Sequence, residues 1–412
     1  MTPDNAFLSG TRVVDLTFNR AGPSCTAMLA ALGAEVIRVE SLKRVDPNRM
    51  RRVSVDKTQA TWGTDPTQME STWNFNSINM GKLGVRLNLR SDGGKDVLRR
   101  LVEVSDIVVE AFSPGTLEDM GFGYDVLREW RRDVILVSVS GFGRGGPHAG
   151  YRAYADVFGA AGGIQYLTGY PDEQPMWFVG RLDSTVGAHG VFGALGALME
   201  RDGTGRGQHV DLSAGESVTT LLGGPMMDYL LNGRVASRDG NRSEEMAPHN
   251  CYRCAGEDEW VSIAVATDDE WVSLCRVMER DDLATDSRFA DLPARKAHED
   301  ELDAIVGEWT GARGSYEAME LLQNSGVAAV PSFNAAQLFG DSHLNERSAW
   351  VHFEHPVQGP RHDLRLPWVF SDGHGVYGPA PLMGQHNGRI YGDLLGIRSD
   401  EIAALERGEV IY

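Results

Sequence analysis

Apolar runs alternate with helical periodicities along the first half of the chain. Short runs typical of buried strands occur at 12–16, 35–40, 107–110, 134–139 and 208–212. The segments between them carry small or amphipathic residues and predict helices over 21–32, 94–104, 117–130 and 187–200. Near-continuous apolar strands that alternate with helices are typical of a parallel sheet covered on both faces. The first half is therefore predicted to be an α/β domain.

The pattern changes after about residue 245. A strand signal at 260–265 is followed by amphipathic segments at 270–280 and 298–309. From residue 326 onward, loops and short strands lead to a final helical segment before Ile411. The segments from about 245 to 309 predict a smaller α+β domain, and the chain has no evident internal repeat.

Length and composition narrow the class of protein. The 412 residues exceed one typical domain, and 42% hydrophobic with 24% charged residues suits a globular protein. No stretch approaches the roughly 20 apolar residues of a membrane helix, and residues 1–5 lack a basic start and an apolar signal core. We therefore expect a cytoplasmic protein with no membrane partner. The net charge of −19 also disfavours nucleic acid as a partner, because an acidic surface repels phosphates.

One basic cluster stands out against this acidic background. It consists of Lys43, Arg44, Arg49, Arg51 and Arg52. Two interpretations remain open for it, a solvated loop or a patch for an anionic ligand such as a nucleotide phosphate.

Common catalytic motifs give little support to several classes of enzyme. The stretch 141–146 matches G-x-G-x-x-G after a strand, but 147–150 suits a turn and not the helix that a dinucleotide-binding motif needs. This argues against NAD binding. The remaining interpretation is a glycine-rich loop close to some other ligand. The sequence has no P-loop, no G-x-S-x-G elbow and no H-E-x-x-H pair, so no metal site is expected. Cys251 and Cys254 form a C-x-x-C without a second pair, and we interpret them as two thiols at a strand edge.

Asp183 is the remaining residue that suggests chemistry. It lies between the apolar segment 176–179 and the start of a helix. A carboxylate at a helix N-terminus is usually a cap. The same position would suit a nucleophile, because the helix amides could hold negative charge. The residues alone leave both interpretations open.

Several segments, in order along nearly the whole chain, resemble family III CoA-transferases. This family includes formyl-CoA:oxalate and carnitine CoA-transferases and the related acyl-CoA racemases. Each matching segment is short, but their number and order make the resemblance strong. The segments are 10–17 with 21–23, 32–40, Asn76 and Asn79 before Lys82, 106–115 with Met120 and Gly121, 139–143, 204–208 with Val210 and Asp211, His355 and Pro356, and 384–386.

The resemblance places the family's nucleophilic aspartate at Asp183, although Leu182 replaces the usual small residue. It implies that Asp183 attacks an acyl-CoA thioester, giving a mixed anhydride and then an aspartyl-CoA thioester. An acceptor carboxylate would complete the exchange. The implied enzyme is a CoA-transferase whose partners are an acyl-CoA and a small carboxylic acid. Coenzyme A thioester is the substrate, and no permanently bound cofactor is expected.

The resemblance also implies a fold. The large domain would be Rossmann-like with a parallel sheet and would comprise 1–225 and 335–412. A small α+β domain at 245–330 would be inserted into it, with linkers at 226–244 and 331–345. Members of the family form interlocked homodimers, in which each chain threads through the other.

Contacts to CoA follow from the resemblance residue by residue. The pantetheine arm is expected beside Arg20 and Ala21, and the adenine and phosphates beside Leu87, Asn88, Leu89 and Arg90. The further lining residues are Phe112, Arg152 and Tyr154. Two departures, Ala111 for the common Asn and Asp119 for a frequent Arg, imply rearranged phosphate contacts, which the basic cluster at 43–52 could supply.

Two other functions remain open on the same scaffold. One is an acyl-CoA racemase or isomerase, but the racemases have a His where this chain has Tyr154 or Ala155, so half of the acid–base pair is missing. The other is a CoA-binding protein without catalysis. The glycine-rich loop of the formyl/oxalate enzymes is absent from 241–250, so oxalate is not the expected acceptor.

Overall fold

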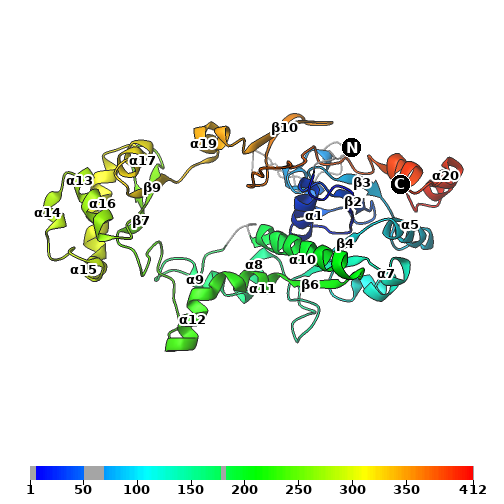
Figure 1. The fold of residues 1–412 in the computed structure, drawn as a ribbon, viewed down its shortest axis with the longest axis horizontal. Coiled ribbons are helices and arrows are strands. Elements are labelled where there is room, and N and C mark those ends of the chain that lie inside the picture. Colours follow the sequence, from blue (N-terminus) through cyan, green and yellow to red (C-terminus); the bar gives the residue numbers. More distant parts are fainter. Residues whose placement is uncertain (1–5, 51–68, 178–181, 412) are drawn as a thin grey trace. The chain divides into compact units, whose positions relative to one another are not determined.

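In the computed structural model, which describes residues 6–50, 69–177 and 182–411, the chain divides into two units (Figure 1). Unit 1 comprises Met1–Gln165, Trp177–Arg234 and Glu346–Tyr412, and unit 2 comprises Tyr166–Met176 and Val235–Asn345. The domain boundaries that the resemblance implies stay a prediction, and each unit is described by itself.

A six-stranded parallel sheet forms the centre of unit 1, in the order β3-β2-β1-β4-β5-β6. Its strands are β1 (Arg12–Asp15), β2 (Glu35–Glu40), β3 (Leu83–Arg86), β4 (Ile107–Glu110), β5 (Ile135–Ser140) and β6 (His209–Ser213). The predicted α/β class with a parallel sheet is confirmed. The strand order reverses between β1 and β4, and ligands of such sheets bind outside the carboxyl ends of the strands at this switch point.

Helices cover both faces of this sheet. The early helices are α1 (Ala21–Ala31), α2 (Pro47–Met50), α4 (Trp73–Asn76), α5 (Asp92–Glu103), α6 (Thr116–Asp119), α7 (Tyr124–Trp130), α8 (Ala155–Ala161) and α9 (Ile164–Leu167). The later elements are α10 (Leu182–Thr204), α11 (Ala214–Thr219), η2 (Thr220–Leu222), α12 (Gly223–Asn232), the hairpin β10 (Trp350–His355) and β11 (Gly359–Leu364), η3 (Gly388–Leu394) and α20 (Ser399–Arg407). None of the described helices combines the length and the apolar character needed to cross a membrane.

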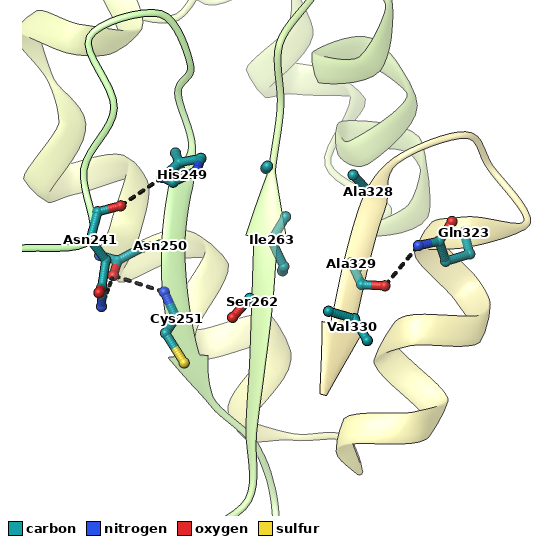
Figure 2. A pocket seen from close by; sticks show the side chains of 11 residues that line it. Asn241, His249, Asn250, Cys251, Ser262, Ile263, Gln323, Ala328, Ala329 and Val330 are labelled. Atoms are coloured by element: carbon teal, nitrogen blue, oxygen red, sulfur yellow. Dashed lines mark hydrogen bonds between the residues drawn. The ribbon is translucent and has the colours of Figure 1, made fainter. Parts of the chain in front are cut away.

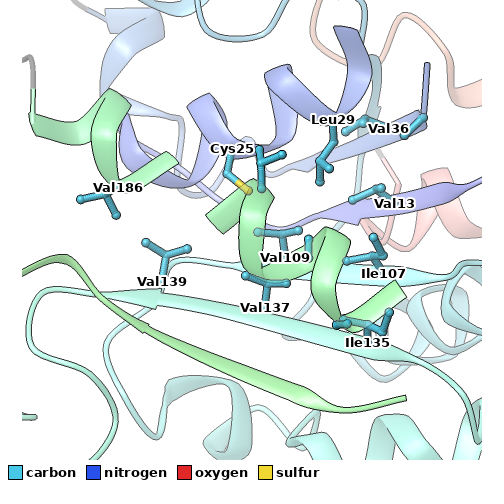
Figure 3. Packing of buried hydrophobic residues seen from close by; sticks show 14 of the residues in the cluster. Val13, Cys25, Leu29, Val36, Ile107, Val109, Ile135, Val137, Val139 and Val186 are labelled. Atoms are coloured by element: carbon cyan, nitrogen blue, oxygen red, sulfur yellow. The ribbon is translucent and has the colours of Figure 1, made fainter. Parts of the chain in front are cut away.

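Successive side chains of the central strands point to opposite faces, as the pleat requires. One face, which carries Val13 and Val109, packs against α1 and α10 through Cys25, Leu29 and Val186 (Figure 3). The opposite face packs against α5, α7 and the C-terminal helical segments. Both faces are therefore buried, which explains why these strands are apolar almost throughout.

Glycines let α10 lie very close to the start of α1. A Cβ added at Gly187 would lie 2.9 Å from Ser24 Cβ and 3.0 Å from the backbone nitrogen of Cys25. A Cβ at Gly190 would lie 2.9 Å from Cys25 Sγ. The small residues of α10 thus let its first turns pack directly against α1.

The C-terminal segment covers the outer edge of β3. Gly84 N donates to His386 Nδ1 at 3.0 Å, and His386 N donates back to Gly84 O at 2.9 Å. Arg86 N donates to Asn387 Oδ1 at 3.0 Å. Backbone groups that an edge strand would leave unpaired are satisfied here by residues about 300 positions later in the chain.

Unit 2 contains a three-stranded antiparallel sheet in the order β7-β8-β9 and a helical layer. The strands are β7 (His249–Arg253), β8 (Trp260–Ala264) and β9 (Ala328–Pro331). The helices are α13 (Asp268–Val277), α14 (Asp281–Ala284), α15 (Leu292–Ala297), α16 (Glu299–Gly311), α17 (Ser315–Gln323), α18 (Ala335–Gly340) and α19 (Ser342–Glu346). Trp271, Phe289 and Leu302 centre its core. A Thr267–Glu270 capping box begins α13, two residues before the amphipathic segment predicted there.

The helix predicted over 117–130 is wrong as one element. It is two helices, α6 and α7, separated by a turn in which Gly121 has φ of 85°. A left-handed residue cannot continue a right-handed helix, and only glycine adopts this conformation without strain.

Candidate active site

The residues assigned to CoA by resemblance lie in segments that follow the carboxyl ends of the strands in unit 1. Arg20 and Ala21 follow β1, Leu87 to Arg90 follow β3, and Phe112 follows β4. Arg152 and Tyr154 lie on the segment after β5, where Tyr154 precedes α8. Parallel strands end at one edge of the sheet, so the topology gathers these segments on the side where α/β proteins bind ligands.

Hydrogen bonds fix the turn that connects β1 to α1. The buried Asp15 carboxylate accepts from both Thr17 N and Thr17 Oγ1, and from Thr26 Oγ1 in α1 at 2.8 Å. Gly22 sits so close to this turn that an added Cβ would lie 2.6 Å from Thr17 Cβ. The first turn of α1 therefore has a defined position, with Arg20 immediately before it.

A buried ammonium group supports the same turn. Lys82 Nζ lies 3.0 Å from Asp15 Oδ2, 3.0 Å from Pro23 O, 2.7 Å from Thr26 Oγ1 and 2.8 Å from Asn79 Oδ1. Burial alone would raise the pKa of Asp15, but Lys82 and Arg38 outweigh it and lower that pKa to about 2. Lys82 thus neutralises a buried carboxylate and ties β3 to the first turns of α1.

Asp183 lies in the first turn of α10, half-buried. The helix begins at Leu182, five residues earlier than predicted, so Asp183 is inside the helix and not before it. Part of the apolar segment expected just upstream, 178–179, lies outside the described residues. The Gly187 contact with α1 places Asp183, one turn earlier on α10, beside the N-terminal end of α1.

Three charged groups interact at this position. Burial raises the pKa of Asp183 to about 6, the Arg20 guanidinium partly opposes this rise, and the Asp156 carboxylate adds to it. Asp183 is therefore mostly ionised at neutral pH but more basic than an exposed aspartate. Such a carboxylate combines charge with enhanced nucleophilicity.

Asp156 was not among the residues predicted from the sequence. It lies in the first turn of α8, and Gly159 on the same face of that helix packs against Leu182, since an added Cβ there would meet Leu182 Cδ1 at 2.6 Å. Its Oδ1 is buried and has no hydrogen-bond partner in the described chain. In the sequence, Asp156 is an acid two residues after the predicted CoA contact Tyr154. Nothing in that pattern distinguishes it from an ordinary carboxylate at the start of a helix.

Arg20 is half-buried and has no polar partner among the described residues. Its Nε is buried without a hydrogen-bond partner, and its side chain makes no ion pair with any acid of the described segments. The guanidinium lies 5.9 Å from the ring centroid of Trp73, whose side chain is half-exposed. By contrast Arg12, Arg131 and Arg144, which are buried to a similar degree, each pair with carboxylates.

The basic cluster at 43–52 is only partly a surface patch. Arg49 is buried and makes a two-pronged pair with Glu40, at 2.8 Å through both Nε and Nη2, and a further pair with Glu70. Its charge is therefore used internally, which corrects the interpretation of this residue as a ligand for phosphate. Arg44 is exposed and stacks over Phe18 at 4.9 Å, while Arg51 and Arg52 lie outside the described residues.

The remaining predicted contacts differ in what they can offer a ligand. The Leu87 side chain is fully buried in the core, so only its backbone can face the edge of the sheet. Arg90 is exposed beside Asn88, whose Oδ1 accepts from Arg90 N at 3.2 Å. Phe112 lies 5.8 Å from Phe18 across the switch point between β1 and β4. Together Phe18, Phe112 and Arg44 form an aromatic and cationic wall there.

The glycine-rich loop 141–146 is anchored by its one charged residue. Arg144 N donates to both oxygens of Asp211, at 3.1 and 2.9 Å, and its guanidinium bridges Glu110 and Glu118. Glu110, buried at the end of β4, also accepts from Phe112 N at 2.6 Å. The loop is thus tied to the segment that carries Phe112.

Unit 2 has a pocket of its own, with a volume of about 360 Å³, on the sheet β7-β8-β9 (Figure 2). His249, Asn250 and Cys251 line it from β7, and Ala328 and Val330 from β9. It contains none of the residues predicted for the active site.

Cys251 and Cys254 are free thiols at the edge strand, and the described residues contain no group of side chains arranged to hold a metal ion.

Comparisons with known proteins agree with this architecture. A family model described as CoA-transferase family III matches residues 8–387. The chain is 33% identical to a succinyl-CoA–D-citramalate CoA-transferase and 32% identical to the β subunit of a succinyl-CoA–L-malate CoA-transferase, both from Chloroflexus aurantiacus, over 98% of every chain. A crystal structure of a CAIB/BAIF family protein from Brucella suis matches with a TM-score of 0.84 and 30% identity, covering 95% of this chain and all of that one.

Proposed function

The chain belongs to CoA-transferase family III, and we propose that it moves CoA from an acyl-CoA to a carboxylic acid through covalent intermediates on Asp183. Membership makes it an enzyme of the CoA-transferase type that acts on CoA thioesters. The observation that carries the proposal is the half-buried, unusually basic Asp183 carboxylate beside the N-terminal end of α1. A racemase is not favoured, because the relatives are named as transferases and the His expected of a racemase is absent at Tyr154 and Ala155.

The reaction begins with the acyl donor. An Asp183 oxygen attacks the thioester carbon, the C–S bond breaks, and CoA leaves as a thiolate, which gives a mixed anhydride. The thiolate then attacks Cγ of Asp183, the donor acid leaves as a carboxylate, and an aspartyl-CoA thioester remains. Each step exchanges one acyl bond for another, so no oxidant, ATP or metal is consumed.

The acceptor reverses this sequence. Its carboxylate attacks Cγ of Asp183 and expels CoA thiolate, and the thiolate then attacks the acceptor acyl carbon of the new anhydride. The product acyl-CoA leaves and the Asp183 carboxylate is regenerated. The raised pKa of Asp183 favours the first attack, and backbone amides at the start of α1, which lies beside Asp183, could stabilise a developing oxyanion.

We propose that CoA lies along the carboxyl edge of the sheet. The backbone at Arg20 and Ala21 would face the pantetheine arm, and Arg90 and Arg152 are the exposed cations for its phosphates. Phe112 and Tyr154 would line the path. Since Arg49 is engaged with acids, Arg44 is the cation of the 43–52 cluster that we expect to contribute.

The relatives suggest the first substrates to test. Their names combine succinyl-CoA with the acids D-citramalate and L-malate. We propose that this chain also uses a dicarboxylic acyl donor and a small, polar carboxylic acid as acceptor.

We also propose a homodimer. Helix α12 has no buried residue, although it presents Leu230 and Leu231, which are 70% and 74% exposed. Phe192, on α10, is 80% exposed. Isolated unit 1 would leave this apolar surface in water, and a second copy of the chain would cover it. Sedimentation at falling concentration should show a persistent dimer, whereas a monomer at micromolar concentration would contradict the proposal.

A mass measurement tests the covalent mechanism. We expect succinyl-CoA to label the peptide that contains Asp183, and hydroxylamine to release the label. The Asp183→Ala variant should bind CoA as the wild type does but form no adduct and turn nothing over. A CoA-binding wild type that forms no adduct with any of a panel of acyl-CoAs would refute the mechanism and leave a non-catalytic binding protein.

A further inference from the structure

The surroundings of Arg20 point to a bound hydrogen-bond acceptor. It is a half-buried cation with no ion-pair partner among the described residues, and its buried Nε has no hydrogen-bond partner. Leaving the buried Nε donor of Arg20 unsatisfied is unfavourable, and a bound acceptor would complete it. The missing group must be an acceptor of hydrogen bonds, and an anion suits a guanidinium best.

The charge that Arg20 senses changes during the reaction. At rest, Arg20 interacts with the Asp183 carboxylate, and the Asp156 carboxylate also acts on Asp183. A second acid that entered then would compete with the Asp183 carboxylate for Arg20. Once Asp183 is acylated its charge is gone, and the Arg20 guanidinium is available to a second carboxylate.

We propose that the Arg20 side chain binds the carboxylate of the acceptor acid, and that this site becomes favourable only when Asp183 carries an acyl group or CoA. The inference rests on the proposed covalent mechanism and assigns the acceptor to a residue of the same site. Arg20 and Asp183 are close enough to interact but form no direct ion pair. One carboxylate oxygen would stay on the guanidinium while the other attacks Cγ of Asp183.

Trp73 gives this site a wall. Its ring centroid lies 5.9 Å from the guanidinium carbon of Arg20, so the indole limits how the guanidinium group can rotate. An acid on the Arg20 guanidinium would therefore lie near the Trp73 ring, and the Asp183 carboxylate disfavours its binding to the resting enzyme.

An equilibrium measurement tests this without turnover. Asp183→Asn mimics the uncharged, acylated side chain, so we expect L-malate, D-citramalate or succinate to bind this variant roughly 10- to 100-fold more tightly than the resting wild type. The double variant Asp183→Asn with Arg20→Met should lose this gain, and Arg20→Lys in the same background should retain part of it. Calorimetry with the full-length protein gives the affinities. Equal affinity in the single and double variants, or no binding of any of the three acids to Asp183→Asn, would overturn the inference.

Kinetic measurements distinguish a role of the Arg20 side chain in binding the acceptor acid from a role in binding CoA. At pH 8, above the pKa of about 6 of Asp183 in the wild type, Arg20→Met should raise the acceptor concentration for half-maximal discharge of the adduct about tenfold or more. The acyl-CoA concentration for half-maximal adduct formation should change little. Arg90→Met is the reciprocal control, because it should weaken acyl-CoA and spare the acceptor. The reverse pattern in Arg20→Met would assign its side chain to CoA, whereas a wild type without any adduct would refute the covalent mechanism itself.

Discussion

Substituting Gly187 by alanine should separate α10 from α1 and displace Asp183. The new Cβ would lie 2.9 Å from Ser24 Cβ, 3.0 Å from Cys25 N and 3.2 Å from Ala21 O. Ordinary contacts of such atoms are about 3.5–4.0 Å, so the helices must move apart by several tenths of an ångström or more. Two of the three atoms belong to the backbone, and a change of side-chain rotamer cannot relieve these contacts.

The expected energies follow from two opposing terms. Alanine in place of glycine inside a helix gains about 1 kcal/mol from propensity. Overpacking of a close contact costs about 1–3 kcal/mol. We therefore expect Gly187→Ala to be neutral or to lose up to about 2 kcal/mol of unfolding free energy. Gly307→Ala is the matched control, because it also lies inside a helix and an added Cβ there meets no atom within 4 Å. It should gain about 1 kcal/mol.

Activity should respond more sharply than stability. A misplacement of about 1 Å at a reacting group can cost about 100-fold in rate, and Gly187 is one turn from Asp183. The assay is the rate of adduct formation on Asp183 from succinyl-CoA, beside urea unfolding of both variants. If Gly187→Ala gains as much stability as Gly307→Ala and labels at the wild-type rate, the close helix contact does not position the nucleophile.

Two further predictions follow from the charged groups. Adduct formation at low acyl-CoA should fall about tenfold per pH unit below about pH 6, because the pKa of Asp183 is raised to about 6 and only its carboxylate attacks. Asp156→Asn removes a neighbouring negative charge, lowers that pKa and should move this limb to lower pH; an unmoved pH profile would contradict the coupling. Lys82→Met leaves the buried Asp15 with Arg38 as its one remaining counter-charge among the described residues and should cost up to about 3–5 kcal/mol in urea unfolding. Arg398→Met is the control, because Arg398 forms an exposed ion pair with Asp400, and it should cost less than about 1 kcal/mol. Similar small losses of unfolding free energy in both variants would show that the buried pair is no more important for stability than the exposed one.

The sequence predicted the strands of unit 1 well where both faces are buried. Glu35–Glu40 and Ile107–Glu110 have the predicted limits, because an apolar run between polar turns has few alternative structures. The strand β3 was missed, since it is short and contains Gly84, which only the distant C-terminal segment explains. An added Cβ there would meet Leu382 O at 2.9 Å.

The site was harder to predict than the sheet. The resemblance selected Asp183 and Arg20, but the residues around them depend on contacts between distant segments. Asp15 and Lys82 are 67 positions apart and Asp156 acts on Asp183 across two helices, so neither relation has a local signature. A local signal did exist for buried ion pairs, since charged residues such as Arg38 within a strand buried on both faces must find partners. The sequence could not say which partners.

The C-terminal segment that covers β3 has a consequence for synthesis on the ribosome. The edge of β3 receives its hydrogen bonds from His386 and Asn387, and the bond from Arg86 to Asn387 spans 301 positions. At about 5–20 residues per second, roughly 15–60 s pass between the emergence of the strand and that of its cover. During that interval the nascent sheet presents an open edge, which is a template for pairing with another chain. The edge of the nascent sheet therefore stays unpaired only if association with other chains is slow, if such chains are scarce, or if a chaperone covers it until the C-terminal segment has been synthesised.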